Sequence, residues 1–449
     1  MTDFAEVAVR SRTRHTADAS LKPAEGRAYA LVAWLCLIPA LLPTRELSLQ
    51  VGVNLTPGRI CVILLLAPAL MTLTRGGARF RWPDAFALAT AGWIVIASVS
   101  VKGPAALLTA AGGEALEYLG AYLIGRAFFA GTPTLRELLH VLRIVTVVLL
   151  LFALADRVTG QWIIENTAAS LMHVTPAGAN YRLGVIRATA SLDHPILLGA
   201  FFAVVSTLFC FSNESPMRRI PYILAGLVGC YLTLSSASVM AWGIGVAAFF
   251  YDRLLRTFPW RWGLFWAALA SLMAAVMVVA NAPLGWVLTH LTWDPQSAYF
   301  RYLIWNHAID WIAQSPFVGF DFSKLNDSIL DASVDCVWLV YALRFGVPMI
   351  VFLFLTNLTA VWPLKQGAKP DADGDFLIRM SRGCTVMLLL FMFIGLTVHF
   401  WNFMWIFWGL MQGVKATIRD RAGRQQRGVT KTAPTMAVAF GRHAEALPR

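Results

Sequence analysis

Residues 195–212 read PILLGAFFAVVSTLFCFS, an apolar run of 18 residues without a charged side chain. A helix needs about 20 mostly apolar residues to cross the hydrocarbon core of a bilayer. The run begins with proline, which suits the start of a helix because the missing N–H would have no partner there. This stretch predicts a membrane-spanning helix, and similar runs recur along the chain.

The composition of the whole chain supports the same class of protein. Of its 449 residues 58% are hydrophobic and 14% charged, and the mean hydropathy is +0.62. Soluble domains have about a quarter of their residues charged. So much apolar side chain predicts an all-α integral membrane protein that crosses the bilayer many times. A water-soluble enzyme or binding module is excluded.

Apolar runs of sufficient length predict twelve spans. Their approximate positions are 28–43, 57–74, 84–101, 106–126, 138–156, 195–212, 219–235, 237–252, 264–281, 336–361, 382–398 and 400–414. The fourth run contains Glu114 and Glu117, and the other mid-span charges are mainly Arg143 and Arg344. The predicted domains are a cytoplasmic tail (1–27), a membrane domain (28–414) and a basic cytoplasmic tail (415–449).

The basic residues predict the orientation of these spans. With both termini inside, 27 of the 37 Lys and Arg lie on the cytoplasmic side and 8 outside. This bias is the positive-inside signature of membrane proteins. It accounts for the formal net charge of +12 without a nucleic-acid partner, and the basic tail can contact anionic lipid.

Two outer segments, 157–194 and 282–335, are longer than simple connections. Both are rich in aromatic and apolar residues, which argues against disorder. Ordered loops of this length usually carry function. We therefore expect a functional site on the outer face of the membrane domain.

The first outer loop ends in RLGVIRATASLDHP, residues 182–195. Asp193 is a candidate N-cap of the following span. Two interpretations of Arg182 stay open, an anchor to lipid headgroups and a substrate ligand. For Arg187 we favour a functional role because it lies deep in a loop that is expected to be ordered. His194 stands at the mouth of the span.

The second outer loop contains SAYFRYLIWNHAIDWIAQSPFVGF, residues 297–320. A helix over 297–313 would place Arg301 and Trp305 one turn apart on one face. Its aromatic spacing is typical of a helix in the membrane interface. The sequence Gln-Ser-Pro at 314–316 ends it, and a glycine follows at 319. Asp310 is expected to pair with a neighbouring cation, and His307 lies nearby.

Asp335 precedes the tenth predicted span, in SVDCVWLVYALRFGVP. An ionisable group at the edge of a span is a functional candidate, whereas aspartate is also among the best N-cap residues. Both interpretations stay open. The six cysteines stand singly and predict small buried side chains, with neither a disulfide framework nor a metal site.

Arginines gathered on the outer face suit a diphosphate, because guanidinium groups bind phosphate oxygens bidentately and stay charged. A carboxylate or histidine beside them could take a proton from an attacking hydroxyl. Without that chemistry the pattern fits a transporter or channel equally well.

The order and spacing of four motifs resemble the bacterial O-antigen ligase and polymerase superfamily, membrane glycosyltransferases of the GT-C type. The motifs cover about residues 180–350, and they are RLGVIRATASLDHP, the Ser-rich LTLSSASVMAWGIGVA, RYLIWNHAIDWIAQSPFVGF and SVDCVWLVYALRFGVP. The resemblance implies a transferase, independent of metal and of other cofactors, that acts outside the inner (cytoplasmic) membrane of bacteria. Its implied substrate is an oligosaccharide linked to undecaprenyl diphosphate.

The resemblance also implies roles for individual residues. Arg187 and Arg301 match positions that hold the diphosphate, with Arg182 as a further ligand, and the leaving group would be stabilised as its charge develops. Trp305 would support Arg301 by packing. The implied catalytic residues are Asp335 and His194, with His307 as another candidate base.

Asp335 departs from the ligases of this superfamily, which have a histidine at the matching position. Together with the modest outer loop, the acidic residue favours a polymerase of lipid-linked repeat units in exopolysaccharide or O-antigen synthesis. One alternative is a ligase that transfers the glycan to lipid A-core or another acceptor, and another is a lipid-linked oligosaccharide flippase. A flippase and a chain-length regulator of the same pathway are possible partners of a polymerase.

Overall fold

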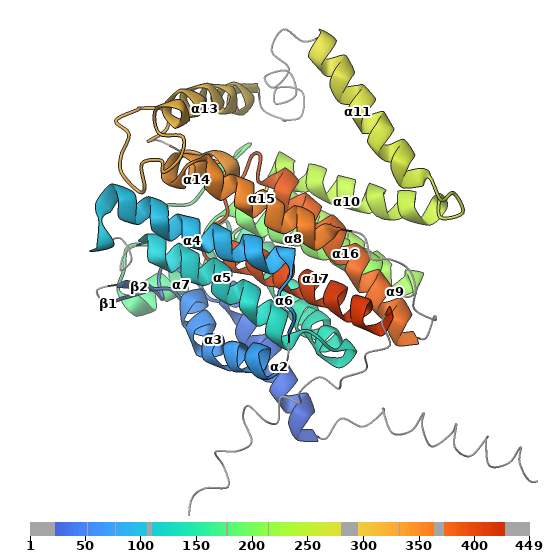
Figure 1. The fold of residues 1–449 in the computed structure, drawn as a ribbon. Coiled ribbons are helices and arrows are strands. Elements are labelled where there is room, and N and C mark those ends of the chain that lie inside the picture. Colours follow the sequence, from blue (N-terminus) through green and yellow to red (C-terminus); the bar gives the residue numbers. More distant parts are fainter. Residues whose placement is uncertain are drawn as a thin grey trace, which may run out of the picture.

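The computed structural model is a bundle of α-helices with two short β-hairpins (Figure 1). It describes residues 23–51, 53–76, 78–105, 110–176, 178–213, 215–279, 295–331, 333–362 and 372–426. The helices of the first half are α2 (Pro23–Leu37), the 3-10 helix η1 (Ile38–Leu41), α3 (Pro57–Arg75), α4 (Trp82–Lys102), α5 (Ala110–Phe128), α6 (Thr132–Thr159), α7 (Ile163–Met172) and α8 (Pro195–Ser212). Those of the second half are α9 (Pro216–Leu232), α10 (Ser236–Leu254), α11 (Arg261–Val279), α13 (Pro295–Gln314), α14 (Val337–Phe345), α15 (Val347–Val361), α16 (Ala372–Ile394) and α17 (Phe403–Gln426).

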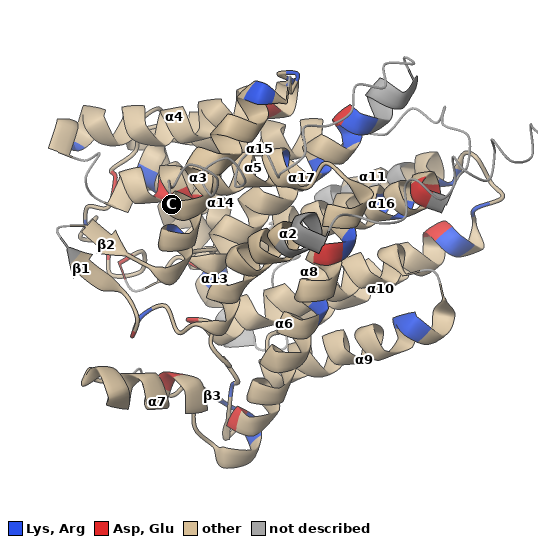
Figure 2. Cartoon of the chain, turned by 90° about the horizontal axis from the view of Figure 1, so that it is seen from below, with Lys and Arg blue, Asp and Glu red and all other residues tan. Residues whose placement is uncertain are grey.

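The chain is a helical membrane protein, as the composition predicts. In the described residues, five helices are long and apolar enough to cross a bilayer, namely α3, α4, α6, α8 and most of α16. Figure 2 shows the charged residues mostly near the ends of the helices, with long uncharged stretches between them. Each of the twelve predicted spans contains a helix, while their number and their orientation in a membrane stay predictions.

Helix α8 forms the centre of one half of the bundle, where α9, α10 and α16 pack around it. Its residues are almost all buried, which explains why the run is apolar on every side. In the other half α5 packs against α3, α4 and α17. Glycines allow α5 and α17 to approach closely, since a Cβ at Gly413 would lie 2.1 Å from the carbonyl oxygen of Tyr122.

The predicted span over 336–361 is not one continuous helix, because Gly346 divides it into α14 and α15. Gly346 has a φ of 78°, which glycine adopts without steric cost. The segment after α13 fills the break, where the N–H of Val347 donates to the carbonyl of Pro316 at 2.7 Å. A Cβ at Gly346 would lie 2.0 Å from the carbonyl oxygen of Phe317. The break is therefore a docking point for the second long loop.

Two predicted domain boundaries fall inside helices. Helix α2 already begins at Pro23, inside the predicted N-terminal tail. Helix α17 extends to Gln426, and Lys415 is buried in it with its ammonium donating to the hydroxyl of Ser381 at 2.6 Å. The rest of both predicted tails, 1–22 and 427–449, lies outside the described residues.

Both long loops contain ordered structure in their described parts, as expected. The first holds α7 and an antiparallel hairpin of β3 (Tyr181–Arg182) and β4 (Val185–Ile186), and the second holds α13. A further hairpin, β1 (Leu49–Val51) and β2 (Val53–Leu55), precedes α3 and was not predicted.

The mid-span charges are paired inside the bundle. Arg344 of α14 donates to Glu114 of α5 at 3.0 Å, and Arg59 of α3 donates to Glu117 of α5 at 3.0 Å. Arg143 donates to the amide oxygen of Asn213 at 2.9 Å. Pairing lowers the cost of placing these charges in an apolar environment. The six cysteines are free and mostly buried, as the sequence predicted.

Candidate functional site

Arg187 lies in a buried, irregular segment between β4 and α8. Residues 187–192 are nearly inaccessible, and Arg187 itself is only 6% exposed. Its Nε–H donates to the carbonyl of Thr233 at 2.8 Å, and one Nη1–H reaches Asn180 Oδ1 at 3.5 Å. Its other three N–H groups make no hydrogen bond with a described residue. A guanidinium that is buried in this way is positioned to bind an anion.

The Ser-rich turn between α9 and α10 orients two arginines at once. Leu234 has a φ of 49°, in the left-handed region that non-glycine residues rarely adopt. The carbonyl of Leu234 accepts from Arg182 Nη1 at 2.8 Å, next to the Thr233 carbonyl that accepts from Arg187. Backbone strain of this kind often occurs at functional sites. The turn therefore fixes the spacing of Arg182 and Arg187.

The charges of Arg182, Arg301 and Asp335 all act on Arg187. Burial, together with the charges of Arg182 and Arg301, lowers the pKa of Arg187 to about 10, although the charge of Asp335 acts to raise it. The structure thus brings together these four residues, although they come from separate segments of the chain. We call this group the arginine site. Its excess of positive charge favours an anionic ligand.

His194 rather than Asp193 is the N-cap residue of α8, so the predicted cap is wrong. The His194 Nδ1 accepts the N–H of Ile196 at 3.2 Å, which places the proton of the neutral ring on Nε2. Burial and the charge of Arg187 lower the pKa of His194 to about 4, while Asp335 opposes them. At neutral pH His194 is an uncharged hydrogen-bond donor at the edge of the arginine site.

Asp335 is not an N-cap either, because the residue at that position of α14 is Cys336, which makes no side-chain cap bond. Asp335 is partly buried, and its Oδ1 accepts the hydroxyl of Ser333 at 2.7 Å. Its charge stabilises the cationic forms of Arg187 and His194. Asp335 is therefore a carboxylate of the arginine site.

The predicted helix of the second loop exists as α13, and its other candidate residues have separate surroundings. His307 Nδ1 lies 2.9 Å from Asp327 Oδ2, which also accepts from the indole of Trp311. Trp305 packs on a small apolar cluster that α13 forms with α14. Asp310 is exposed, and the predicted ion pair is not seen among the described residues. Thus only Arg301 of this helix is coupled to the arginine site.

Several residues next to the arginine site had no distinct sequence signal. Asn402, in the turn before α17, donates to Asp193 Oδ2 at 2.9 Å, and the neighbouring Trp401 ring lies 6.0 Å from the ring of His194. Glu46 and Glu165 are each 4% exposed, and each has a buried Oε1 with no hydrogen-bond partner in the described chain. One sequence signal could have pointed to Asn402, which follows HFW at 399–401. Asparagine tolerates the left-handed backbone, and Asn402 has a φ of 50°.

The charges of these carboxyl groups act on one another. Burial raises the pKa of Glu165 to about 8, and the charges of Glu46, Asp193 and Asp156 raise it too. Burial also raises the pKa of Asp193 to about 6, with the amide of Asn402 lowering it and Glu46 raising it. We call Glu46, Glu165 and Asp193 the carboxyl group cluster. It lies beside the arginine site because Asp193 and His194 are adjacent.

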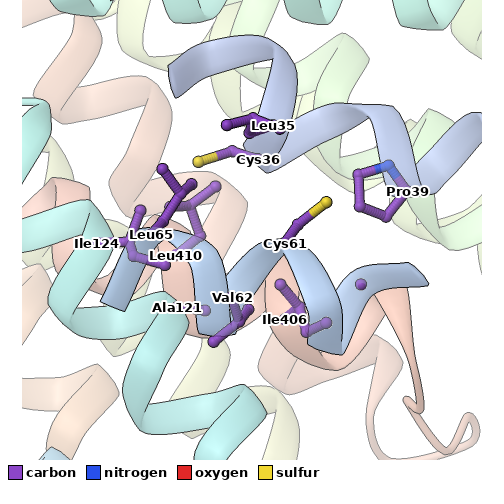
Figure 3. A pocket seen from close by; sticks show the side chains of 11 residues that line it. Leu35, Cys36, Pro39, Cys61, Val62, Leu65, Ala121, Ile124, Ile406 and Leu410 are labelled. Carbon is purple, nitrogen blue, oxygen red and sulfur yellow. The ribbon is translucent and has the colours of Figure 1, made fainter. Parts of the chain in front are cut away.

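A small cavity elsewhere in the bundle has a different character. It lies between α2, α3, α5 and α17, and its lining is apolar apart from the thiols of Cys36 and Cys61 (Figure 3). None of the candidate residues of the outer loops contributes to it. It therefore has no polar group to orient a phosphate or a sugar.

Among the described residues, no group of three His, Cys, Asp or Glu side chains is arranged to hold a metal ion. The chemistry that the site can perform with its own residues is anion binding by guanidinium groups and proton transfer by carboxyl groups. Compared with models of known protein families and with curated protein sequences, the chain matches none.

Proposed function

We propose that the protein is a membrane glycosyltransferase that joins oligosaccharide repeat units carried on undecaprenyl diphosphate, at the outer face of the bacterial inner membrane. The observation that carries this proposal is the gathering of Arg182, Arg187 and Arg301 beside the carboxylate of Asp335. A diphosphate supplies the negative charge that a buried guanidinium favours. The four motifs that resemble the O-antigen ligase and polymerase superfamily support the same substrate.

In this proposal the arginines hold the diphosphate and stabilise it as it leaves. Arg187 contributes three N–H groups that bind no described residue, and the carbonyls of the Ser-rich turn keep its guanidinium in place. Charge stabilisation by fixed donors is most effective when they need no reorganisation during the reaction. The buried surroundings of Arg187 strengthen the interaction because water screens it less.

A transporter of the same lipid is the competing function. A transport path would need polar groups continuing through the middle of the bundle. The charged residues inside the bundle include the pairs Arg344–Glu114 and Arg59–Glu117, whereas α8 carries no charge along its length and the loop with Arg182 and Arg187 precedes it. This arrangement favours an enzyme over a transporter.

Reconstitution into liposomes tests the proposal. Purified protein receives lipid-linked repeat units, and the product lengths are read on a gel. A ladder of products is the expected result, and a single product on an added lipid A-core acceptor would instead indicate a ligase. Arg187→Ala and Arg301→Ala should abolish the product, whereas Arg136→Ala, which removes an exposed ion pair with Asp373, should not. Lipid movement across the bilayer without any product would overturn the enzyme proposal.

A further inference from the structure

We propose that Asp193 is the general base of the transfer reaction, accepting the proton of the attacking sugar hydroxyl. This inference rests on the proposed function, which leaves the base unassigned. The carboxylate of Asp193 is held by the side-chain amide of Asn402 at 2.9 Å, so one oxygen is fixed and the orientation of the group is set. It lies one residue from His194 and therefore at the edge of the arginine site.

The residues on the arginine side are poor candidates for this role. His194 Nδ1 already accepts the N–H of Ile196, and Nε2 carries the proton of the neutral ring. Asp335 faces the arginines, since its charge acts on Arg187 and on His194. In a direct displacement the base stands on the face of the sugar opposite the leaving group. The charge of Asp335 acts on Arg187, whereas the charge that acts on Asp193 is that of Glu46, so Asp193 is the carboxylate less tied to the residues that hold the diphosphate.

Asp193 belongs to the carboxyl group cluster, and the other two members of the cluster come from other parts of the fold. Glu46 precedes β1, Glu165 lies on α7, and Asp156 at the end of α6 acts on Glu165. Glu46 and Glu165 are nine-tenths or more buried, and each has an Oε1 without a hydrogen-bond partner among the described residues. These two buried carboxyl oxygens can therefore accept a hydrogen bond or a proton. The cluster is thus suited to take up the proton released during transfer.

The protonation of Asp193 suits a base that works near neutral pH. Its pKa of about 6 leaves it ionised at pH 7 and basic enough to attract a proton. In the step itself, the hydroxyl oxygen forms a bond to the anomeric carbon and its proton passes to Asp193. The bond from that carbon to the diphosphate oxygen breaks, and its electron pair leaves with the diphosphate, which the arginines hold.

The test uses the full chain in liposomes and three variants over a range of pH. Asp193→Asn should lower turnover about 100-fold or more while undecaprenyl diphosphate binds as in the wild type. Activity of the wild type should rise through a midpoint near pH 6, because the base must be ionised. Glu46→Gln should move this midpoint to lower pH, since the charge of Glu46 raises the pKa of Asp193. Asn402→Gly should move it to higher pH while keeping the left-handed backbone.

The midpoint of activity should shift in opposite directions in Glu46→Gln and Asn402→Gly if Asp193 is catalytic. A structural role of Asp193 would leave the midpoint in place in both variants. Asp373→Asn, at an exposed carboxylate paired with Arg136, is the matched control and should keep the wild-type profile. Turnover within about threefold of the wild type in Asp193→Asn, or an unmoved midpoint in both other variants, would overturn the inference and leave the proposed function standing. A wild type that makes no product from any lipid-linked glycan would overturn both. If Asp193→Asn fails to fold, the pH–activity profiles of Glu46→Gln and Asn402→Gly test the inference instead.

Discussion

The guanidinium of Arg187 donates to the carbonyl of Thr233 at 2.8 Å, joining two loops that are 46 positions apart in the sequence. The turn that carries Thr233 packs against α8 at Gly199, where a Cβ would lie 2.4 Å from the Ser238 hydroxyl oxygen and 2.7 Å from that of Thr233. The arginine site thus depends on a glycine of a predicted membrane span. The position of the turn, and with it that of Arg187, follows from how closely α8 approaches it.

Gly199→Ala should therefore damage the site from within the bundle. The new methyl group would push the Ser-rich turn away from α8, lowering both the melting temperature and the affinity for undecaprenyl diphosphate. Gly243→Ala in α10 is the control, because no atom lies within 4 Å of its Cβ position. Alanine is a better helix former than glycine by about 1 kcal/mol, so this control should be neutral or slightly stabilising. Equal melting temperatures of the two variants in detergent would contradict the packing argument.

Substitutions of Arg187 should separate its charge from its geometry. Arg187→Ala removes a charged hydrogen-bond donor, and such bonds contribute about 1.5–3 kcal/mol, so binding of pyrophosphate should weaken about 10-fold or more. Arg187→Lys keeps the charge without the planar fork and should also bind more weakly than the wild type. Isothermal titration calorimetry of the solubilised protein measures both.

The same titrations at different pH values test the protonation state of Arg187. Its pKa, lowered to about 10, leaves the group charged at pH 7–9 and neutral above 10. The contribution of Arg187 to pyrophosphate binding should therefore be constant up to about pH 9 and decline above 10. A difference between wild type and Arg187→Ala that already disappears at pH 8 would contradict the assignment.

The sequence predicted the helical elements well because apolar runs and prolines mark them locally. The run at 195–212 coincides with α8, and the helix expected over 297–313 is α13. The break at Gly346 was not predicted, because it depends on the carbonyl of Phe317 from another segment. The N-cap role predicted for Asp193 was wrong, and of the two interpretations of Asp335 the N-cap does not hold. An aspartate can accept from many donors, and the one bound to Asp193 is Asn402, 209 positions away.

The grouping of the arginine site could be proposed from sequence, whereas the carboxyl group cluster could not. Arg187 and Arg301 stood out because positive charge is rare on the predicted outer face. Glu46 and Glu165 had no such contrast, and their orphan oxygen atoms and the raised pKa of Glu165 arise only from burial among other elements. Burial of single polar side chains is a property of tertiary packing, which no local pattern encodes.

The loop after α13 should lose stability in acid because of one carboxylate. Asp327 accepts hydrogen bonds from His307, Trp311 and the N–H groups of Ile329 and Leu330, and despite some desolvation these lower its pKa to about 2. An unfolded aspartate titrates near pH 4. The stabilisation is therefore complete above about pH 4 and is lost as the pH falls towards 2.

Thermal unfolding of the wild type and Asp327→Asn between pH 2 and 6 measures this contribution. The variant should melt at a lower temperature at pH 6, and the difference should narrow below pH 4. Asp310→Asn is the control, because that exposed carboxylate has no ion pair among the described residues. A constant difference across the whole range would show that the charge of Asp327 is not what stabilises the loop.

The Arg344–Glu114 ion pair should be needed to hold α14, and with it the segment that carries Asp335. Arg344 Nη1 lies 3.0 Å from Glu114 Oε1, while Glu114 Oε2 is buried without a partner in the described chain. Arg344→Met leaves the carboxylate without this partner. Breaking a fully buried pair costs about 3 kcal/mol or more, and this pair, whose side chains are 27% and 16% exposed, should cost somewhat less. Protonation of Glu114 would reduce that cost, so the loss should be largest at high pH.

A double-mutant cycle separates the pair from other effects of these substitutions. Arg344→Met with Glu114→Gln should recover part of the stability lost in Arg344→Met alone, because no charge remains buried. The Arg136–Asp373 pair, whose side chains are each 58% exposed, provides the comparison and should give a coupling energy of about 0–1 kcal/mol. The coupling energy of Arg344–Glu114 is compared directly with that of this exposed pair. If it were no larger, the backbone contacts with the segment after α13 would be what mainly holds α14. Transfer activity is measured in the same variants. If Asp335 must keep its place beside Arg187, activity should fall in the variants in which α14 is less stable.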